Sequence, residues 1–381
     1  MAAMRVAVFR ALMLGDLLCA TPALRALRHG WPDAQITLVG LPWARALAER
    51  LASVDSFIEF PGWPGLPERR RECGTTLRAW LAAMRSRRFD MALQLHGSGE
   101  CVNGLVAAFG AKRCAAFVPG AVQNTAHHAM HRTVHDPVPW PAQGSEVERL
   151  LALTDRLALP RQGTGLDFPL RDGDRDAAER LCRPLGGRRF VLLHPGSQLP
   201  SRRWPAERFA AVGDALAAEG LAVVLTGSAG EAPLTRAVAE RMRAPCLDLA
   251  GCTDLWMLGA LVEWAAAVVC NDTGISHIAA ALGTPSVVVA SGSDVPRWAP
   301  ADSERHRVFW RDLPCRPCAQ VHCPHDQACA RAVDADDVAQ AALAHLGRPQ
   351  WHEHGHLQRV VVQRPAPRHP PHETLSEARS A

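Results

Sequence analysis

Short apolar runs alternate with helix-like segments along most of this chain. Such runs fit buried strands, whereas apolar positions at helical spacing fit helices that cover a sheet. The first half carries strand-like runs at residues 5–9, 36–39 and 91–95 and helix-like segments at 21–28 and 76–85. The second half carries strand-like runs at residues 190–194, 222–226, 268–270 and 286–290 and helix-like segments at 206–219, 234–242 and 255–265. This alternation predicts an α/β protein with two doubly wound domains.

A stretch rich in Gly, Pro and Asp, residues 167–174, lies between two helix-like segments and predicts the domain boundary. We therefore expect one domain over residues 1–168 and a second over residues 169–346. Residues 347–381 are rich in Pro, His and Arg and show no sustained period, so they predict a disordered tail.

The composition fits a globular enzyme and argues against a nucleic-acid partner. The formal net charge is only +4, and no basic run is interleaved with aromatic residues. Residues 4–18 could pass for a signal peptide, but Gly15 and Asp16 interrupt the apolar stretch, so a buried first strand is favoured. No apolar run approaches the ~20 residues needed to span a bilayer. We expect a cytoplasmic protein whose contact with the inner membrane, if it forms, is peripheral.

Residues 271–277, with the sequence Asn-Asp-Thr-Gly-Ile-Ser-His, join a strand-like run to a helix-like run. Such a loop lies at the carboxyl end of a strand, where the amides and dipole of the helix attract anions. Thr273 offers a hydroxyl, Gly274 lets the backbone approach a ligand, and His277 lies one turn further on. The alternative is that Asp272 or Thr273 only caps the helix.

Asp16 follows the first strand and lies in the first turn of the next helix-like segment. In a two-domain α/β protein this position faces the cleft between the domains. Asp16 is a candidate general base for an incoming hydroxyl. The alternative is a carboxylate that only complements the helix dipole.

Two further strand ends carry residues suited to a nucleotide. Residues 194–197, His-Pro-Gly-Ser, lead to Arg202 and Arg203. Ser197 offers a hydroxyl in a glycine turn, and one arginine supplies positive charge to a phosphate, although adjacent arginines are often only solvated. Glu231 ends the small-residue loop after the next strand and could accept hydrogen bonds from ribose hydroxyls. Glycine in this loop could equally serve the backbone turn alone.

Four cysteines follow within fifteen residues: Cys315, Cys318, Cys323 and Cys329. Four thiolates resemble a closed structural site for zinc or iron, but the second pair is not a C-x-x-C, so free thiols remain an alternative. The Asp-Ala-Asp at residues 334–336 precedes a helix-like segment and is interpreted as a cap. No P-loop and no G-x-G-x-x-G fingerprint is present, so ATP hydrolysis and nicotinamide chemistry lose support.

Taken together, these motifs resemble glycosyltransferase family 9, the ADP-heptose:lipopolysaccharide heptosyltransferases. The matching segments occur in family order over residues 4–346: Leu-Gly-Asp at 14–16 with Thr-Pro-Ala-Leu at 21–24, His-Pro-Gly-Ser at 194–197 with Arg-Arg-Trp-Pro at 202–205, and Asn-Asp-Thr-Gly at 271–274 with Ser-His at 276–277.

The resemblance implies a GT-B fold, in which two Rossmann-like domains face each other across a cleft. It implies an acceptor-binding first domain, a nucleotide-sugar-binding second domain, and inverting transfer that requires no metal cofactor. The family's catalytic aspartate falls on Asp16, its sugar-binding carboxylate falls on Asp272, and its phosphate contacts fall on Ser197, Arg202, Thr273 and Gly274. Family members commonly have lysine at the position of Arg202, so the charge is kept but the geometry differs.

The implied donor is ADP-heptose and the implied acceptor is a lipopolysaccharide core sugar. Residues 94–104 carry no basic cluster for an anionic acceptor, which leaves the acceptor open. Three other functions remain open from the sequence: a protein-glycosylating heptosyltransferase, a GT-B-type nucleotide-sugar epimerase, and a non-catalytic regulator that binds nucleotide or metal.

Overall fold

The computed structural model describes residues 3–68, 75–119 and 134–346 and contains two parallel six-stranded sheets. The first has the strand order β3-β2-β1-β4-β5-β6. Its strands are β1 (Arg5–Phe9), β2 (Gln35–Gly40), β3 (Ser56–Glu59), β4 (Met91–Gln94), β5 (Arg113–Val118) and β6 (Asp136–Pro139). The helices of this half are α1 (Leu14–Leu18), α2 (Thr21–Gly30), η1 (Pro42–Ala44), α3 (Arg45–Ala48), α4 (Thr75–Ser86), α5 (Asn103–Ala107) and α7 (Glu146–Arg156).

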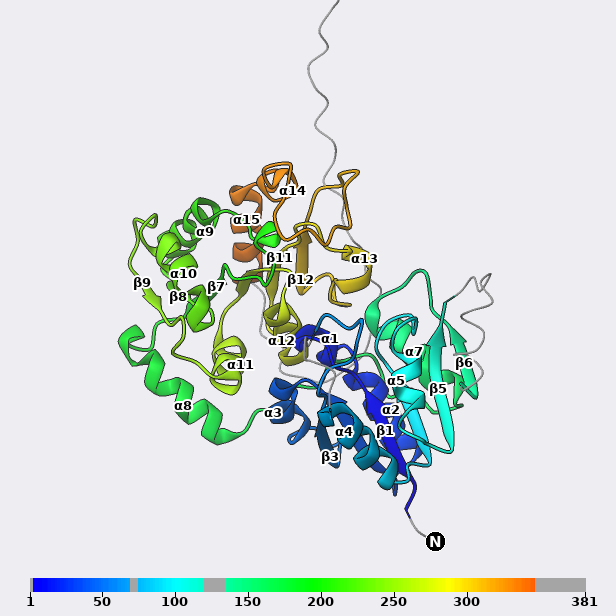
Figure 1. Cartoon of the computed structure of the whole chain (residues 1–381). Coiled ribbons are helices and arrows are strands. Elements are labelled where there is room, and N and C mark those ends of the chain that lie inside the picture. The colour runs from blue at the N-terminus through cyan, green and yellow to red at the C-terminus, as the bar shows by residue number, and fades with distance from the viewer. Residues whose placement is uncertain (1–2, 69–74, 120–133, 347–381) are drawn as a thin grey trace, which may run out of the picture.

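The second sheet has the strand order β12-β11-β10-β7-β8-β9. Its strands are β7 (Phe190–His194), β8 (Ala222–Leu225), β9 (Cys246–Asp248), β10 (Val268–Asn271), β11 (Ser286–Val289) and β12 (His306–Phe309). The helices of this half are α8 (Asp172–Cys182), η2 (Arg183–Leu185), η3 (Pro200–Arg202), α9 (Ala206–Ala218), η4 (Ala229–Glu231), α10 (Ala232–Ala239), α11 (Leu255–Trp264), α12 (Gly274–Leu282), α13 (Val295–Trp298), α14 (Ala328–Arg331) and α15 (Ala335–Leu346). Figure 1 shows the two sheets side by side, each flanked by its own helices.

Both sheets have the same topology when their strands are numbered from the start of each half. The order is 3-2-1-4-5-6, which is that of a Rossmann fold. The central strands are buried along most of their length because helices cover both faces, and this explains their continuous apolar sequences. The predicted doubly wound α/β architecture is therefore confirmed.

Every strand and helix expected above is present, with ends shifted by a few residues at most. Five strands were not predicted: β3, β5, β6, β9 and β12. All but β5 have three or four residues, and β3 and β9 are half-exposed, so their apolar runs are weak. β6 contains two prolines, which are tolerated because it is an edge strand.

The predicted boundary stretch includes the start of α8, whose N-terminus is Asp172. A helix begins there because Arg171 is extended and its N–H donates to the Asp174 carboxylate at 2.8 Å. The division at residue 168 stays a prediction. The expected tail over residues 347–381 lies outside the described residues.

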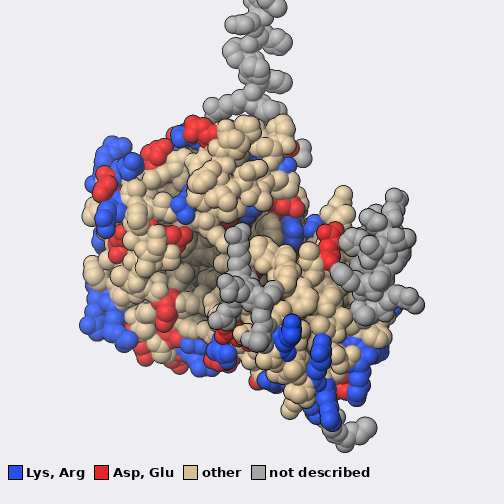
Figure 2. Space-filling view, viewed as in Figure 1, with Lys and Arg blue, Asp and Glu red and all other residues tan. Residues whose placement is uncertain are grey.

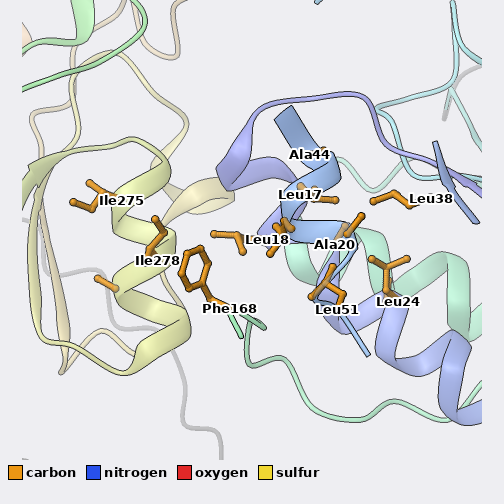
Figure 3. Packing of buried hydrophobic residues seen from close by; sticks show 14 of the residues in the cluster. Leu17, Leu18, Ala20, Leu24, Leu38, Ala44, Leu51, Phe168, Ile275 and Ile278 are labelled. Atoms are coloured by element: carbon orange, nitrogen blue, oxygen red, sulfur yellow. The ribbon is translucent and has the colours of Figure 1, made fainter. Parts of the chain in front are cut away.

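One apolar cluster contains residues of both halves. Leu17 and Leu18 of α1, Ile275 and Ile278 of α12, and Phe168 from the connecting segment all belong to it. Figure 3 shows the Phe168 ring between Ile278 and Leu18. Helices α1 and α12 therefore pack against each other through buried side chains, which brings the first turns of both helices to the same region.

Within the described residues, no helix is both long enough and apolar enough to cross a membrane.

Candidate active site

The candidate site lies at the topological switch point of the second sheet. β7 and β10 are neighbours although they are not consecutive, and Cys270 pairs with His194 across them. The loops after both strands therefore leave the same carboxyl edge of the sheet, where ligands bind in doubly wound folds. The structure thus brings together the two predicted phosphate loops, residues 194–203 and residues 271–277.

Asn271 ties these two loops together. Its side chain is fully buried at the end of β10. The side-chain Nδ2 donates to the carbonyl oxygens of Pro195, at 2.8 Å, and Gly196, at 3.3 Å, while Oδ1 accepts from the backbone N–H of Trp204 at 2.9 Å. One amide can hold both ends of the loop after β7 because it carries a donor and an acceptor. Asn271 therefore fixes the loop after β7 against the end of β10.

The helix after β10 begins without help from the Thr273 side chain. Thr273 is extended, with φ −147° and ψ −179°, and its hydroxyl makes no capping hydrogen bond. Its carbonyl oxygen accepts from the backbone N–H of Ser276 at 3.0 Å and from the Ser276 hydroxyl at 2.7 Å. The Thr273 hydroxyl is thus not used as a cap, and the amides at the start of α12 remain suited to an anion.

Arg202 and Arg203 have different partners. Arg203 Nε donates to the carbonyl oxygen of Ser197 at 3.0 Å and so fixes the first loop. Arg202 Nη2 donates to the carbonyl oxygen of Cys318 at 3.0 Å. The buried Nε of Arg202 has no hydrogen-bond partner among the described residues. Arg202 therefore retains a buried N–H donor without a partner among the described residues, whereas Arg203 mainly supports the loop.

Glu231 lies against the first phosphate loop. Its Oε2 accepts from the backbone N–H and the hydroxyl of Ser228, both at 2.8 Å. A Cβ at Gly196 would come within 2.1 Å of Glu231 Oε1. A larger residue there would push the Glu231 carboxylate aside, so this carboxylate stands directly beside the loop that carries Ser197.

Asp16 lies in the first turn of α1 and is partly engaged there. Its Oδ2 accepts from the backbone N–H of Met13 at 3.1 Å, as expected for a carboxylate at a helix start. The side chain is 21% exposed, and its other oxygen, Oδ1, lies 3.8 Å from Nη2 of the buried Arg10. Asp16 is thus held at one oxygen, with an arginine beside the other.

The starts of α1 and α12 meet face to face. A Cβ at Gly15 would lie 2.5 Å from Cδ2 of His277, and a Cβ at Gly274 would lie 3.1 Å from a methyl carbon of Leu14. Burial lowers the pKa of His277, although the carboxylates of Asp272 and Asp16 act in the opposite direction. A neutral His277 therefore packs between the segment that carries Asp16 and the phosphate corner.

A hollow lies near the middle of the face shown in Figure 2.

Comparison with known proteins identifies the family to which this arrangement belongs. A model of glycosyltransferase family 9 (heptosyltransferase) matches residues 77–329, which is more than half of the chain. The chain belongs to glycosyltransferase family 9. It is therefore an enzyme, rather than a non-catalytic nucleotide-binding protein.

Individual relatives agree with the family assignment. Lipopolysaccharide heptosyltransferase 2 of Escherichia coli K12 is 28% identical over 327 residues, which cover 80% of this chain and 88% of that protein. The structure of E. coli ADP-heptose lps heptosyltransferase II superposes with a TM-score of 0.68 at 22% identity, covering 90% of this chain and 98% of that one. A family 9 glycosyltransferase from Veillonella parvula gives a TM-score of 0.73 at 18% identity, covering 90% and 97%. The GT-B fold expected from the motifs is confirmed.

The metal site expected at the cysteine loop of this family 9 chain stays a prediction. No group of three or more His, Cys, Asp or Glu side chains in the described part of the chain is arranged to hold a metal ion. Cys315, Cys318, Cys323 and Cys329 are free thiols that differ in exposure from open to buried. The loop packs on the phosphate loop: Ser201 donates from its N–H to the carbonyl oxygen of Val321 at 3.1 Å. Sequence spacing placed the thiols close along the chain but could not show where each side chain points.

Sequence analysis assigned no role to Arg10, Glu146 or Arg297, which form a chain of ion pairs that begins beside Asp16. Glu146 Oε1 lies 2.9 Å from Arg10 Nη2, and Glu146 Oε2 lies 2.7 Å from Arg297 Nε. The three residues lie far apart in the chain and in no recognisable motif. The one signal was a charged residue, Arg10, directly after an apolar strand, where burial demands a partner.

Proposed function

We propose that this glycosyltransferase transfers a heptose from ADP-heptose to a sugar of the lipopolysaccharide core, with inversion at the anomeric carbon and without a metal ion. The observation that carries the proposal is the contact between α1 and α12, because it sets Asp16 beside the phosphate corner. The relatives are named lipopolysaccharide or lipooligosaccharide heptosyltransferases, and these names support the choice of sugar and acceptor.

In the proposed donor site, Thr273, Gly274 and Ser197 contact the diphosphate, and Arg202 supplies the positive charge. Asp272 lies at the same corner and would accept hydrogen bonds from heptose hydroxyls. A carboxylate there would be repelled by the diphosphate itself, so it suits the sugar.

Two other donor-site residues are assigned through their neighbours. Glu231, beside Gly196, would accept hydrogen bonds from the ribose hydroxyls. His277 forms the wall between the donor corner and α1, since its ring already fills the space beside Gly15.

The proposed chemistry is a single displacement. An acceptor hydroxyl has too high a pKa to attack unaided, so Asp16 removes its proton as the new bond to the anomeric carbon forms. The bond from that carbon to the diphosphate breaks on the opposite face, and ADP leaves with the electron pair. Arg202 and the amides at the start of α12 stabilise the charge on the departing ADP.

The test is an incubation of the protein with ADP-heptose and a set of truncated lipopolysaccharides, followed by mass spectrometry of ADP and of the acceptor. We expect ADP release that depends on one truncated acceptor, with unchanged rates in the presence of a chelator. Asp16→Asn preserves shape but cannot accept the proton, so turnover should fall by ~100-fold or more while donor affinity changes by less than ~1 kcal/mol.

The outcomes separate the alternatives. A general base contributes ~100-fold or more to the rate. If Asp16→Asn keeps more than about a tenth of the wild-type turnover, the base therefore lies elsewhere. If heptose is found on a protein and no lipopolysaccharide is modified, the enzyme is a protein-glycosylating heptosyltransferase. Loss of activity with chelator, restored by added metal, would contradict metal independence.

A further inference from the structure

A fully buried ion pair lies next to Asp16. Arg10 follows β1 and Glu146 begins α7, and both side chains are 0% exposed. Nε and Nη2 of Arg10 donate to the backbone carbonyl oxygen of Asp16, at 3.1 and 2.8 Å. The same Nη2 lies 2.9 Å from Glu146 Oε1. Arg10 therefore fixes the backbone at Asp16, and Glu146 fixes Arg10.

The second oxygen of Glu146 is bound from the other half of the molecule. Arg297 of α13 donates from Nε to Glu146 Oε2 at 2.7 Å. Its guanidinium also lies over two indole rings, 4.6 Å from the centroid of Trp298 in the second half and 5.5 Å from that of Trp140 in the first. Glu146 thus connects an arginine beside the first sheet with an arginine of the second half.

The buried carboxylate of Glu146 needs both arginines as partners. Taking a carboxylate out of water is costly unless it is paired and its oxygens are hydrogen-bonded. Burial alone would raise the pKa of Glu146, but the charges of Arg10 and Arg297 and their hydrogen bonds outweigh it and hold the pKa below its usual range. With Asp16, the cluster contains two cations and two anions. When Arg297 is removed, this balance is broken and Oε2 of Glu146 loses its partner.

We propose that Glu146 is a positioning residue for the transfer reaction, through which docking of α13 against the first half orders Arg10 and thereby the Asp16 carboxylate. The inference rests on Asp16 being the base, as proposed above. Separation of the two halves would break the contact between Arg297 and Glu146 while leaving the pair of Glu146 and Arg10 in place. Asp16 would then be aligned for proton transfer only when the halves are closed.

The direct test replaces Arg297 with methionine, because Arg297 is 26% exposed and its loss leaves the buried pair of Arg10 and Glu146 intact. We expect kcat for ADP release to fall by about 3- to 30-fold, the range for a residue that acts through another, with KM for ADP-heptose within about twofold of wild type. Arg297→Lys keeps the charge and should recover part of the loss.

A matched control is Arg305→Met. Arg305 also lies in the second half and faces a carboxylate, but its partner Asp302 lies three residues away at the surface, 3.8 Å from Arg305 Nε. Its removal should leave kcat within about twofold of wild type, as expected for an exposed pair. Glu146→Gln, checked for folding by circular dichroism, gives a second measurement: adding Arg297→Met to it should slow the enzyme no further.

The Asp16→Asn background distinguishes this inference from the proposed function. If Glu146 and Arg297 act through the carboxylate, Arg297→Met should cost nothing more once Asp16 is already asparagine. An equal loss in both backgrounds, a change in KM alone, or no change in kcat overturns the positioning role and leaves Asp16 as the base. High turnover in Asp16→Asn itself overturns both.

Discussion

At the scale of single residues, two glycines of the site have fixed and specific neighbours. Gly15 faces the ring of His277 and Gly196 faces the carboxylate of Glu231, so a Cβ at either position would require its neighbour to move. Neither glycine has a positive φ. At Gly15 the neighbour is a buried ring that has little room to move, so its close approach, rather than backbone conformation, explains the need for glycine.

Donor binding should distinguish the adjacent arginines. We expect Arg202→Ala to weaken binding of ADP-heptose by ~1.5–3 kcal/mol, the usual contribution of a charged hydrogen bond. Arg203→Ala should weaken it less, because Arg203 contacts the Ser197 carbonyl oxygen and acts only through the loop. Isothermal titration calorimetry with both variants checks this, and equal losses would contradict the assignment of the phosphate contact to Arg202.

At the scale of elements, Asn271 joins the end of β10 to both ends of the loop that follows β7. Asn271→Ala removes the acceptor of the buried Trp204 N–H and the donor to Pro195, so we expect a loss of ~1–3 kcal/mol in unfolding free energy and weaker donor binding. Asn103→Ala is the matched control, because buried Asn103 donates to the Phe117 carbonyl oxygen in the first half. It should lower stability in urea but leave donor affinity unchanged. If both variants bind donor as wild type does, Asn271 does not shape the donor site.

The pairing of β11 with β12 predicts a dependence of stability on pH. His306 is buried beside the hydroxyl of Ser286, with 2.8 Å between Nδ1 and Oγ, and burial lowers its pKa to about 3. Between that value and about 6.5 the unfolded chain binds more protons than the folded one, so stability falls as pH drops through this window. His194 and His277 act in the same direction, because burial lowers the pKa of each.

The measurement is urea unfolding at pH 7 and pH 5. We expect His306→Asn to lose less stability between these two values than wild type does, since one buried neutral imidazole is gone. The exposed His29→Asn serves as the control and should follow wild type. An unchanged difference in the His306 variant would show that this imidazole does not carry the effect.

Elements with strong local signals were predictable, and elements defined by their neighbours were not. β7 is a continuous apolar run with glycine after it, and its predicted bounds match those observed. β9 has three residues and half-exposed side chains, so it is a strand only because β8 pairs with it. The same limit applies to the cysteine loop: spacing could not show how far each thiol is buried, and the metal site that it indicated stays a prediction.

At the scale of the whole molecule, the apolar cluster around Phe168 should couple the two halves during unfolding. Phe168 lies 5.1 Å from the ring of Trp256, measured between centroids, and packs against Gly259. We expect one calorimetric transition in wild type, and in Phe168→Ala a loss of ~3–5 kcal/mol with separation into two transitions. Phe209→Ala, in a cluster confined to the second half, should lower stability but keep one transition. A single transition in Phe168→Ala would show that the coupling lies elsewhere.

The parts of the candidate site differ in how far they could be predicted. Thr273, Gly274 and Ser197 lie at strand ends, and strand ends can be read from hydrophobic patterns. The bridge from Arg10 through Glu146 to Arg297 depends on how the two halves meet, and no local pattern encodes that. Asp16 belongs to a recognisable sequence motif, but its neighbours come from distant parts of the chain and could be identified only from the three-dimensional structure.

The shared apolar cluster also limits how this architecture can be recombined. Two halves with identical strand order suggest an exchange in which the first half of one family member is fused to the second half of another. Here, separating the two halves at the connecting segment would expose Leu17, Leu18 and Ile278 together. A working chimera would therefore have to carry α1, Phe168 and α12 from the same parent, so that the side chains packed between the two halves still match one another.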